Sequence, residues 1–266
     1  MEVRFLKYGI LCLLFGSSLA SCLRDDPIEG YNGSGEDQGS VYTLGTPVSY
    51  STSLEGLSAI CLNEAGEGLY VAEDNGHVYE FSLDGQLRSK LSFPSPDDAH
   101  DWEGICRTPD GSTIYLCEER LRQVYKLNAD HKGVTLVSTG PKESGYQENQ
   151  GYEGIAAGNG VLYIANQSLP KRVYSFNIAS AAWSTVFDFS KASSLSDIFY
   201  DTEDGSIWIT DAKTNLLTQF KGDGTVIHEY DISFVSKPEG FCKDPVRKQF
   251  WFVCDKTSKL YKVSYQ

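Results

Sequence analysis

The stretch HDWEGICRTPDGSTIYLCEER, residues 100–120, decides the fold of this chain. Two short apolar runs flank the turn sequence Pro109-Asp110-Gly111, a pattern that predicts a β-hairpin. Acidic residues stand at both ends of it: Asp101 and Glu103 begin the first expected strand, and Glu118-Glu119 ends the second. The two ends of a hairpin meet at one edge, so these carboxylates should lie on the same side of the fold.

The first strand of this hairpin recurs along the chain. Its apolar anchors fall at residues 60, 105, 155, 198 and 241, so the spacings are 45, 50, 43 and 43 residues. A second strand with an aromatic residue and then a third strand follow each anchor, and turn residues such as Asp84-Gly85 lead into a fourth. This period is typical of propeller blades. We therefore predict an all-β, five-bladed β-propeller of four-stranded antiparallel blades, with six blades as the alternative.

The two ends of the repeated region indicate how the ring closes. The fifth repeat stops at Gln266 after three strands, and residues 46–50 form an extra strand-like segment before the first repeat. We expect this segment to complete the last blade as its outer strand, which leaves few open sheet edges. The propeller domain is predicted to span residues 43–266.

The N-terminus has the features of a bacterial lipoprotein signal peptide over residues 1–21. Basic residues precede an apolar run, 9–15, that is too short for a membrane span of about 20 residues. Leu19-Ala20-Ser21-Cys22 resembles a lipobox, which predicts acylation of Cys22; an ordinary secretory signal with an incidental cysteine is the alternative.

The segment 22–42 is expected to be a lipidated, flexible tether, because it has no periodicity and contains Gly33-Ser34-Gly35. Leu23-Arg24-Asp25-Asp26 resembles the acidic tag that directs some lipoproteins to the outside of the outer membrane. We therefore expect an outer membrane lipoprotein that is exposed at the cell surface.

The chain is acidic, with a formal net charge of −13, which argues against nucleic acid as a partner. The expected domain contains five cysteines: Cys61, Cys106, Cys117, Cys242 and Cys254. Their spacing does not fit a zinc site. We expect buried free thiols, because a disulfide directly across two paired strands is geometrically demanding.

In a propeller the first strand of each blade lines the central channel, so two rings of polar residues should meet at one channel mouth. The starts of the first strands supply Ser58, Glu103, Glu153, Ser196 and Glu239. The ends of the second strands supply Glu73, Glu118, Asn166, Asp211 and Asp255.

Carboxylates gathered at one mouth repel each other unless protons, basic residues or a metal ion neutralise them. Oxygen ligands from separate blades suit Ca²⁺, which accepts six to eight of them in flexible geometry. We predict a calcium ion held by Glu103, Glu153 and Glu239. Further ligands or rim residues are expected among Asp101, Glu118, Asn166, Asp197 and Asp211. The alternative is that each glutamate caps backbone N–H groups of the next blade.

Several of these motifs, taken in order, resemble the SdiA-regulated domain family of bacterial envelope propellers, which are distantly similar to NHL-repeat proteins. The matching segments are Trp102-Glu103-Gly104-Ile105, Glu118-Glu119-Arg120, Tyr152-Glu153-Gly154-Ile155, Ser196-Asp197-Ile198 and Pro238-Glu239-Gly240-Phe241. The resemblance covers roughly residues 45–266 and implies a five-bladed propeller with a calcium site at Glu103, Glu153 and Glu239. The chain departs from the family pattern at Ser196-Asp197, where Ser-Gly is usual, and at Asn166-Gln167-Ser168, where Lys-Glu-Arg is common.

The sequence is compatible with two functions. The first is a surface-tethered binding or scaffold module whose unknown protein or small-molecule ligand sits at the acidic channel face. The second is a calcium-dependent hydrolase of the lactonase or esterase kind, with the metal as Lewis acid. Only His100 lies near the expected active face, and no Gly-x-Ser-x-Gly elbow occurs. We favour the binding module and assign no catalytic residue.

Overall fold

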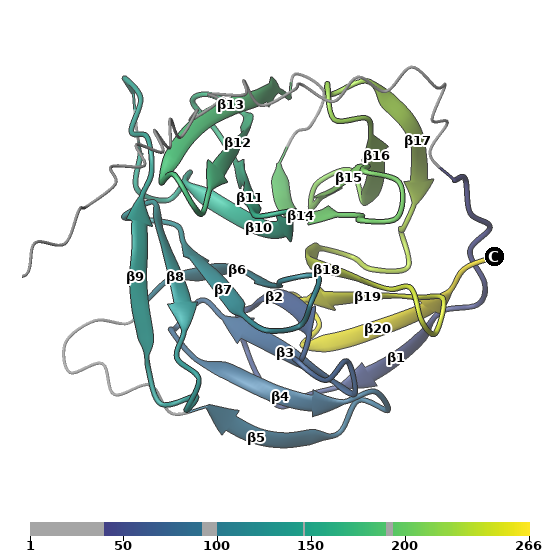
Figure 1. The fold of residues 1–266 in the computed structure, drawn as a ribbon. Coiled ribbons are helices and arrows are strands. Elements are labelled where there is room, and N and C mark those ends of the chain that lie inside the picture. Colours follow the sequence, from purple (N-terminus) through teal and green to yellow (C-terminus); the bar gives the residue numbers. More distant parts are fainter. Residues whose placement is uncertain (1–39, 92–99, 146, 190–193) are drawn as a thin grey trace, which may run out of the picture. The chain divides into compact units, whose positions relative to one another are not determined.

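The computed structural model describes residues 40–91, 100–145, 147–189 and 194–266. These residues form five four-stranded antiparallel sheets that are arranged as blades around a centre (Figure 1), which confirms the five-bladed, all-β propeller. Within the described part of the chain, no helix is long and apolar enough to cross a bilayer. The expected signal peptide, Cys22 and most of the expected tether lie outside the described residues.

Four blades are built from consecutive strands, and each blade begins with its innermost strand. Blade 1 contains β2 (Leu57–Leu62), β3 (Gly68–Glu73), β4 (Val78–Ser82) and β5 (Leu87–Leu91). Blade 2 contains β6 (Trp102–Arg107), β7 (Ile114–Glu118), β8 (Gln123–Leu127) and β9 (Val134–Thr139). Blade 3 contains β10 (Tyr152–Gly158), β11 (Val161–Asn166), β12 (Arg172–Asn177) and β13 (Ala182–Asp188). Blade 4 contains β14 (Leu195–Tyr200), β15 (Ile207–Asp211), β16 (Leu216–Phe220) and β17 (Val226–Asp231).

Blade 5 closes the ring with strands from both ends of the propeller. Its inner strands are β18 (Pro238–Asp244), β19 (Gln249–Cys254) and β20 (Lys259–Ser264), and its outer strand is β1 (Val48–Ser51). β1 pairs with β20 from Val48↔Lys262 to Ser51↔Lys259, so the predicted closure is confirmed.

The N-terminal end of the described chain is fastened beside the C-terminus. The backbone N–H of Thr43 donates to the carbonyl of Gln266 at 2.9 Å, and Lys243 Nζ donates to Tyr42 Oη at 3.0 Å. Lys243 lies near the end of β18 and is also ion-paired with Asp201, with both side chains buried. Both termini of the described region therefore lie on the face where the innermost strands end.

The hydrophobic core lies between neighbouring blades. Five clusters of buried side chains are present among the described residues, and each combines residues from two adjacent blades. In one cluster, for example, Ile60 and Val71 of blade 1 pack with Trp251 and Val253 of blade 5. Cys61, Cys106, Cys117, Cys242 and Cys254 are all buried and free, which confirms the expectation of unbonded thiols.

Every innermost strand has a β-bulge at the same position. The register shifts by one residue between the first and third residues of β2, β6, β10, β14 and β18. The unpaired bulge residues are Ser58, Glu103, Glu153, Ser196 and Glu239. A bulge re-aims the side chain that it carries, so these five residues form the innermost ring of the channel mouth.

In four of the five blades the residue after the bulge is glycine or alanine because the next blade approaches very closely; in blade 4 it is Asp197. A Cβ at Gly104 would lie 2.7 Å from the backbone nitrogen of Ile155, and one at Gly240 would lie 2.9 Å from that of Ile60. The repeated Glu-Gly dipeptide thus combines two requirements: a bulged side chain that faces the channel and a glycine that lets the blades touch.

Candidate functional site

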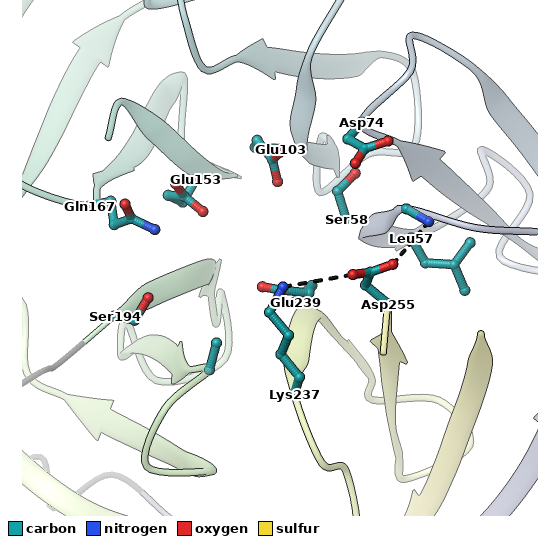
Figure 2. Close-up of a pocket in the computed structure, with 12 residues that line it drawn as sticks. Leu57, Ser58, Asp74, Glu103, Glu153, Gln167, Ser194, Lys237, Glu239 and Asp255 are labelled. Atoms are coloured by element: carbon teal, nitrogen blue, oxygen red, sulfur yellow. Dashed lines mark hydrogen bonds and ion pairs between the residues drawn. The ribbon is translucent and has the colours of Figure 1, made fainter. Parts of the chain in front are cut away.

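A pocket of about 240 Å³ lies at the mouth of the channel, where the innermost strands begin. Figure 2 shows that Glu103, Glu153 and Glu239 approach it from three blades. The structure therefore brings together the three residues that the sequence indicates as an inner ring.

The two serines of this ring have a different role. Ser58 Oγ donates to the carbonyl of Trp102 in blade 2, and Ser196 Oγ donates to the carbonyl of Pro238 in blade 5 at 2.6 Å. These hydroxyls join neighbouring blades, whereas the glutamates extend into the pocket.

The expected outer ring is displaced by one residue in blades 1–4, whereas Asp255 of blade 5 lines the pocket as expected. Glu118 accepts the N–H of Leu121 at 2.6 Å, and Asp211 accepts that of Lys213 at 2.9 Å. The side-chain amide of Asn166 donates to the carbonyl of Ser168 at 3.0 Å. Glu118, Asn166 and Asp211 thus shape the turns after their strands and do not line the pocket.

In blades 1, 3 and 4 the pocket is lined instead by the next residue, Asp74, Gln167 or Ala212, and in blade 2 the next residue, Glu119, lies beside Glu103. In blades 1–4 the backbone N–H of this residue donates to the carbonyl of the residue just before the innermost strand. This bond extends the strand pairing by one step and turns the side chain toward the channel. Asp255 was placed in the ring because its offset from the anchor is 14 residues, and the same offset would have identified Asp74 and Glu119.

Two other candidates lie outside the pocket. Asp197, proposed as a metal ligand or rim residue, is 1% exposed and accepts the N–H groups of Ile198 at 2.8 Å and Phe241 at 2.7 Å. It joins blade 4 to blade 5, so the capping alternative applies to this aspartate. His100 stacks on the ring of Trp102 with centroids 4.3 Å apart and does not line the pocket.

A dense carboxyl cluster occupies the side of the pocket formed by blades 2 and 3. Oxygen atoms of Asp101, Glu103 and Glu119 all lie within 4.8 Å of one another. Glu119 also hydrogen-bonds the carboxyl of Glu153, and its Oε1 accepts the N–H of Gly151 at 3.2 Å. Arg120 Nε lies 3.2 Å from Asp101 at the edge of this cluster.

Glu153 is a buried member of the cluster without a backbone or basic hydrogen-bond donor among the described residues. It is 7% exposed, and its hydrogen-bond partner is another carboxyl, that of Glu119. Burial of a carboxylate without such a donor is costly, so this residue requires a proton or a cation.

The electrostatics of the cluster follow from burial and repulsion. Burial, and then the nearby carboxyls of Glu119 and Asp101, raise the pKa of Glu103 well above its usual range. Burial, and then the carboxyls of Glu103 and Glu119, do the same to the pKa of Glu153. A donor set made only of carboxyl oxygens fits the hard ion Ca²⁺, so the residues present can hold the ion that the sequence predicts.

The opposite side of the pocket contains an ammonium group. Lys237 Nζ contacts Glu239 Oε1 and lies 3.7 Å from Asp255 Oδ2, while Asp255 Oδ1 accepts the N–H of Gly56 at 2.9 Å (Figure 2). Burial raises the pKa of Glu239, and the ammonium of Lys237 opposes this effect. Lys237 was not anticipated from the sequence.

The raised pKa values predict an unusual pH dependence of the metal-free protein. Acids whose pKa is raised by folding bind protons more tightly in the folded state, so they stabilise the fold at low pH. This contribution is lost as pH rises from about 4.3, the unfolded value for Glu, through the folded values. In chelator, we expect a higher melting temperature at pH 5 than at pH 8, and saturating Ca²⁺ should remove the difference. A Glu103→Gln/Glu153→Gln variant should flatten the metal-free profile; an unchanged profile would contradict this account.

A protein-family model described as "Phytase-like: Esterase-like activity of phytase" matches residues 52–212. The chain belongs to this phytase-like family. The match covers most of the described carboxyl cluster of this phytase-like propeller, including Asp101, Glu103, Glu119 and Glu153. No curated protein matches the chain.

Solved structures share the propeller fold with this phytase-like chain. Glutaminyl cyclase of Myxococcus xanthus aligns with a TM-score of 0.63 and 12% identity, over 85% of this chain and 96% of that chain. A gluconolactonase of Xanthomonas campestris aligns with a TM-score of 0.58 and 10% identity, over 83% and 89%. A chain of a nidogen/laminin complex aligns with a TM-score of 0.56 and 12% identity, over 78% and 75%. Identities this low show the fold alone, and the fold serves both enzymes and binding proteins, so function must be argued from the site.

Proposed function

We propose that the acidic pocket binds a calcium ion through Glu103, Glu119 and Glu153, with Asp101 beside them, and that the protein hydrolyses ester bonds. The observation that carries the proposal is Glu153, a buried carboxyl that faces the pocket and other carboxyls without an N–H or basic partner. The esterase-like activity in the description of the family supports the reaction class.

The contacts between blades favour chemistry over a purely stiffening role for the ion. Ser58, Ser196 and Asp197 already join neighbouring blades directly, and β1 closes the ring. Glu103 and Glu239 extend into an accessible pocket instead, although Glu119 also contacts blade 3 through Gly151 and Glu153. An ion held there would keep coordination positions for a ligand, which differs from the stiffening role favoured by the sequence.

The protein's own groups have distinct tasks in such a reaction. When bound, the ion would polarise the ester carbonyl and lower the pKa of a water molecule. Glu103 and Glu153 hold the ion. Glu239 is the base that we assign: Lys237 holds its Oε1, which leaves Oε2 to accept a proton from the attacking water. The ammonium of Lys237 faces the same space and stabilises negative charge on the substrate oxygen.

The test is a calcium titration followed by an ester assay. Ca²⁺ should raise the melting temperature of the purified protein, and neutral aryl esters or lactones should be hydrolysed only without chelator. Glu153→Gln should weaken Ca²⁺ binding at least tenfold, because it removes a charged ligand from a buried site. Glu239→Gln should lower kcat at least 100-fold and leave Ca²⁺ binding nearly unchanged.

Glu229→Gln is the matched control, since Glu229 lies on the outer strand β17 and is exposed. It should behave as the wild type in both assays. Ester turnover that persists in chelator, or in Glu153→Gln at the wild-type rate, would refute the proposed mechanism.

A second candidate is a calcium-dependent binding module, anchored in the outer membrane through Cys22 and related to the SdiA-regulated propellers. One observation favours it: the described residues that line the pocket include neither histidine nor cysteine, and the hydroxyl of Ser58 is bonded to backbone carbonyls. Its ligand would be a protein or small molecule, not nucleic acid, at the acidic face. Calcium binding at Glu103 and Glu153 without turnover of any ester would decide for this candidate.

A further inference from the structure

Blades 2 and 5 present the same pair of carboxylates to the pocket. In each blade one acid sits on the bulge of the innermost strand, Glu103 or Glu239. The other follows the end of the second strand, Glu119 or Asp255. Trp102↔Glu118 and Pro238↔Cys254 are the matching pairs of the two registers, which establishes the equivalence.

The two blades differ two residues before the bulge. Blade 2 has Asp101 there, and its carboxyl joins the cluster with Glu103 and Glu119. Blade 5 has Lys237 at this position, and its ammonium contacts Glu239 and lies 3.7 Å from Asp255. Blade 2 therefore has three carboxyls drawn together with Arg120 only at their edge, beside Asp101, and blade 5 has two carboxyls with an ammonium between them.

Two carboxylates hold the ammonium of Lys237 in the pocket. Its Nζ contacts Glu239 Oε1 and lies 3.7 Å from Asp255 Oδ2. The ammonium supplies one positive charge where a divalent ion would supply two, and its covalent attachment keeps it in place whatever the metal concentration.

We propose that Lys237 is a built-in cation that fills what would otherwise be a second divalent-cation site, formed by Glu239 and Asp255. The inference rests on the proposed function, because it takes the carboxyl cluster of blades 2 and 3 as the site of the metal. The buried Glu153 supports that assignment independently, since its hydrogen-bond partner is another carboxyl, Glu119, and no basic side chain among the described residues neutralises it there.

The arrangement determines which ligands the pocket accepts. It holds one metal ion and one ammonium group on opposite sides, and both attract electron-rich oxygen. Seven carboxyl groups surround the pocket, more than the positive charges that a single ion, Lys237 and Arg120 supply together, so a polyanionic phosphate ester would be repelled. The substrate class is therefore a neutral ester or lactone whose carbonyl oxygen lies between the two cations.

The stoichiometry of Ca²⁺ binding to the intact protein tests the proposal by calorimetry. We expect one ion per chain for the wild type, two for Lys237→Gln, and one for Lys237→Arg, which keeps the charge. Lys237→Gln/Asp255→Asn should return to one ion. The side chain of Lys237 is 46% exposed, so these variants should fold; Lys237→Met provides a second uncharged variant, and thermal melting checks each protein.

The outcomes separate this inference from the proposed function. One ion in both the wild type and the uncharged variants overturns the role of Lys237 and leaves the metal site standing. Two ions in Lys237→Arg also overturn it, because charge would not be what excludes the ion. No ion in any variant overturns the proposed function itself. Hydrolysis of a phosphomonoester faster than of a neutral ester by the calcium-loaded wild type would overturn the substrate class.

Discussion

Replacement of Gly154 by alanine should destabilise the propeller by about 3 kcal/mol, because the new methyl group would meet the backbone of the next blade. The new Cβ would lie 2.7 Å from both Asp197 Cα and the backbone nitrogen of Ile198 in the next blade. These are backbone atoms of an innermost strand, so they cannot rotate away as a flexible side chain would. The ring would have to open at this point, and chemical denaturation measured by circular dichroism would report the loss.

Gly222→Ala is the control for Gly154→Ala. A Cβ at Gly222 meets nothing within 4 Å, and the residue lies in an exposed turn. Its stability should stay within about 0.5 kcal/mol of the wild type. If both alanine variants were equally stable, the close contact between blades 3 and 4 could not be a constraint on the fold.

Asp197→Ala should lower the free energy of unfolding by about 2–4 kcal/mol, because it leaves two buried N–H groups without an acceptor. Those groups belong to Ile198 and Phe241, and the second lies in the neighbouring blade. Calcium affinity should remain within twofold of the wild type, since Asp197 does not line the pocket. Equilibrium unfolding and calcium titration on the same preparations measure the two quantities.

Glu153→Gln is the matched contrast to Asp197→Ala. It should lose calcium binding while the metal-free protein becomes no less stable at pH 8, because a buried carboxyl with a raised pKa is removed. Asp197→Asn keeps one acceptor oxygen and should fall between wild type and Asp197→Ala in stability. A tenfold loss of calcium affinity in Asp197→Ala, with unchanged stability, would show that Asp197 binds the metal ion and contradict its assignment as a contact between blades.

The fold was predictable because the same pattern of strands recurs in every repeat. Anchors such as Ile105 and Ile155 recur at blade spacing, and the unpartnered segment before the first repeat matches the strand missing at Gln266. The closure follows from these two facts and the cost of an open edge. The three glutamates of the inner ring were predictable for the same reason, since their position relative to the anchor does not vary.

The outer ring was not predictable because side-chain direction depends on how far strand pairing extends. Adjacent residues such as Glu118 and Glu119 are chemically alike, and one step along the backbone decides which of them faces the channel. The hydrogen bond from the N–H of Glu119 to the carbonyl of Asp101 extends the strand pairing by one residue, so Glu119 faces the channel and Glu118 does not. Lys237 was missed although Glu239 is only two residues away, because Asp255, its second partner, is brought to it by the register of blade 5.

The point at which the N-terminal segment joins the propeller determines which way the pocket opens. Tyr42 is bonded to Lys243 on the face where the innermost strands end, and the pocket lies where they begin. If Cys22 carries a lipid, as the sequence predicts, a taut tether leaves the pocket pointing away from the membrane and toward the medium. Tension in that tether would load the bonds of Tyr42 and Thr43 first and then β1, whose hydrogen bonds to β20 run across the strand. The strand that closes the ring would then also bear the mechanical load between anchor and pocket.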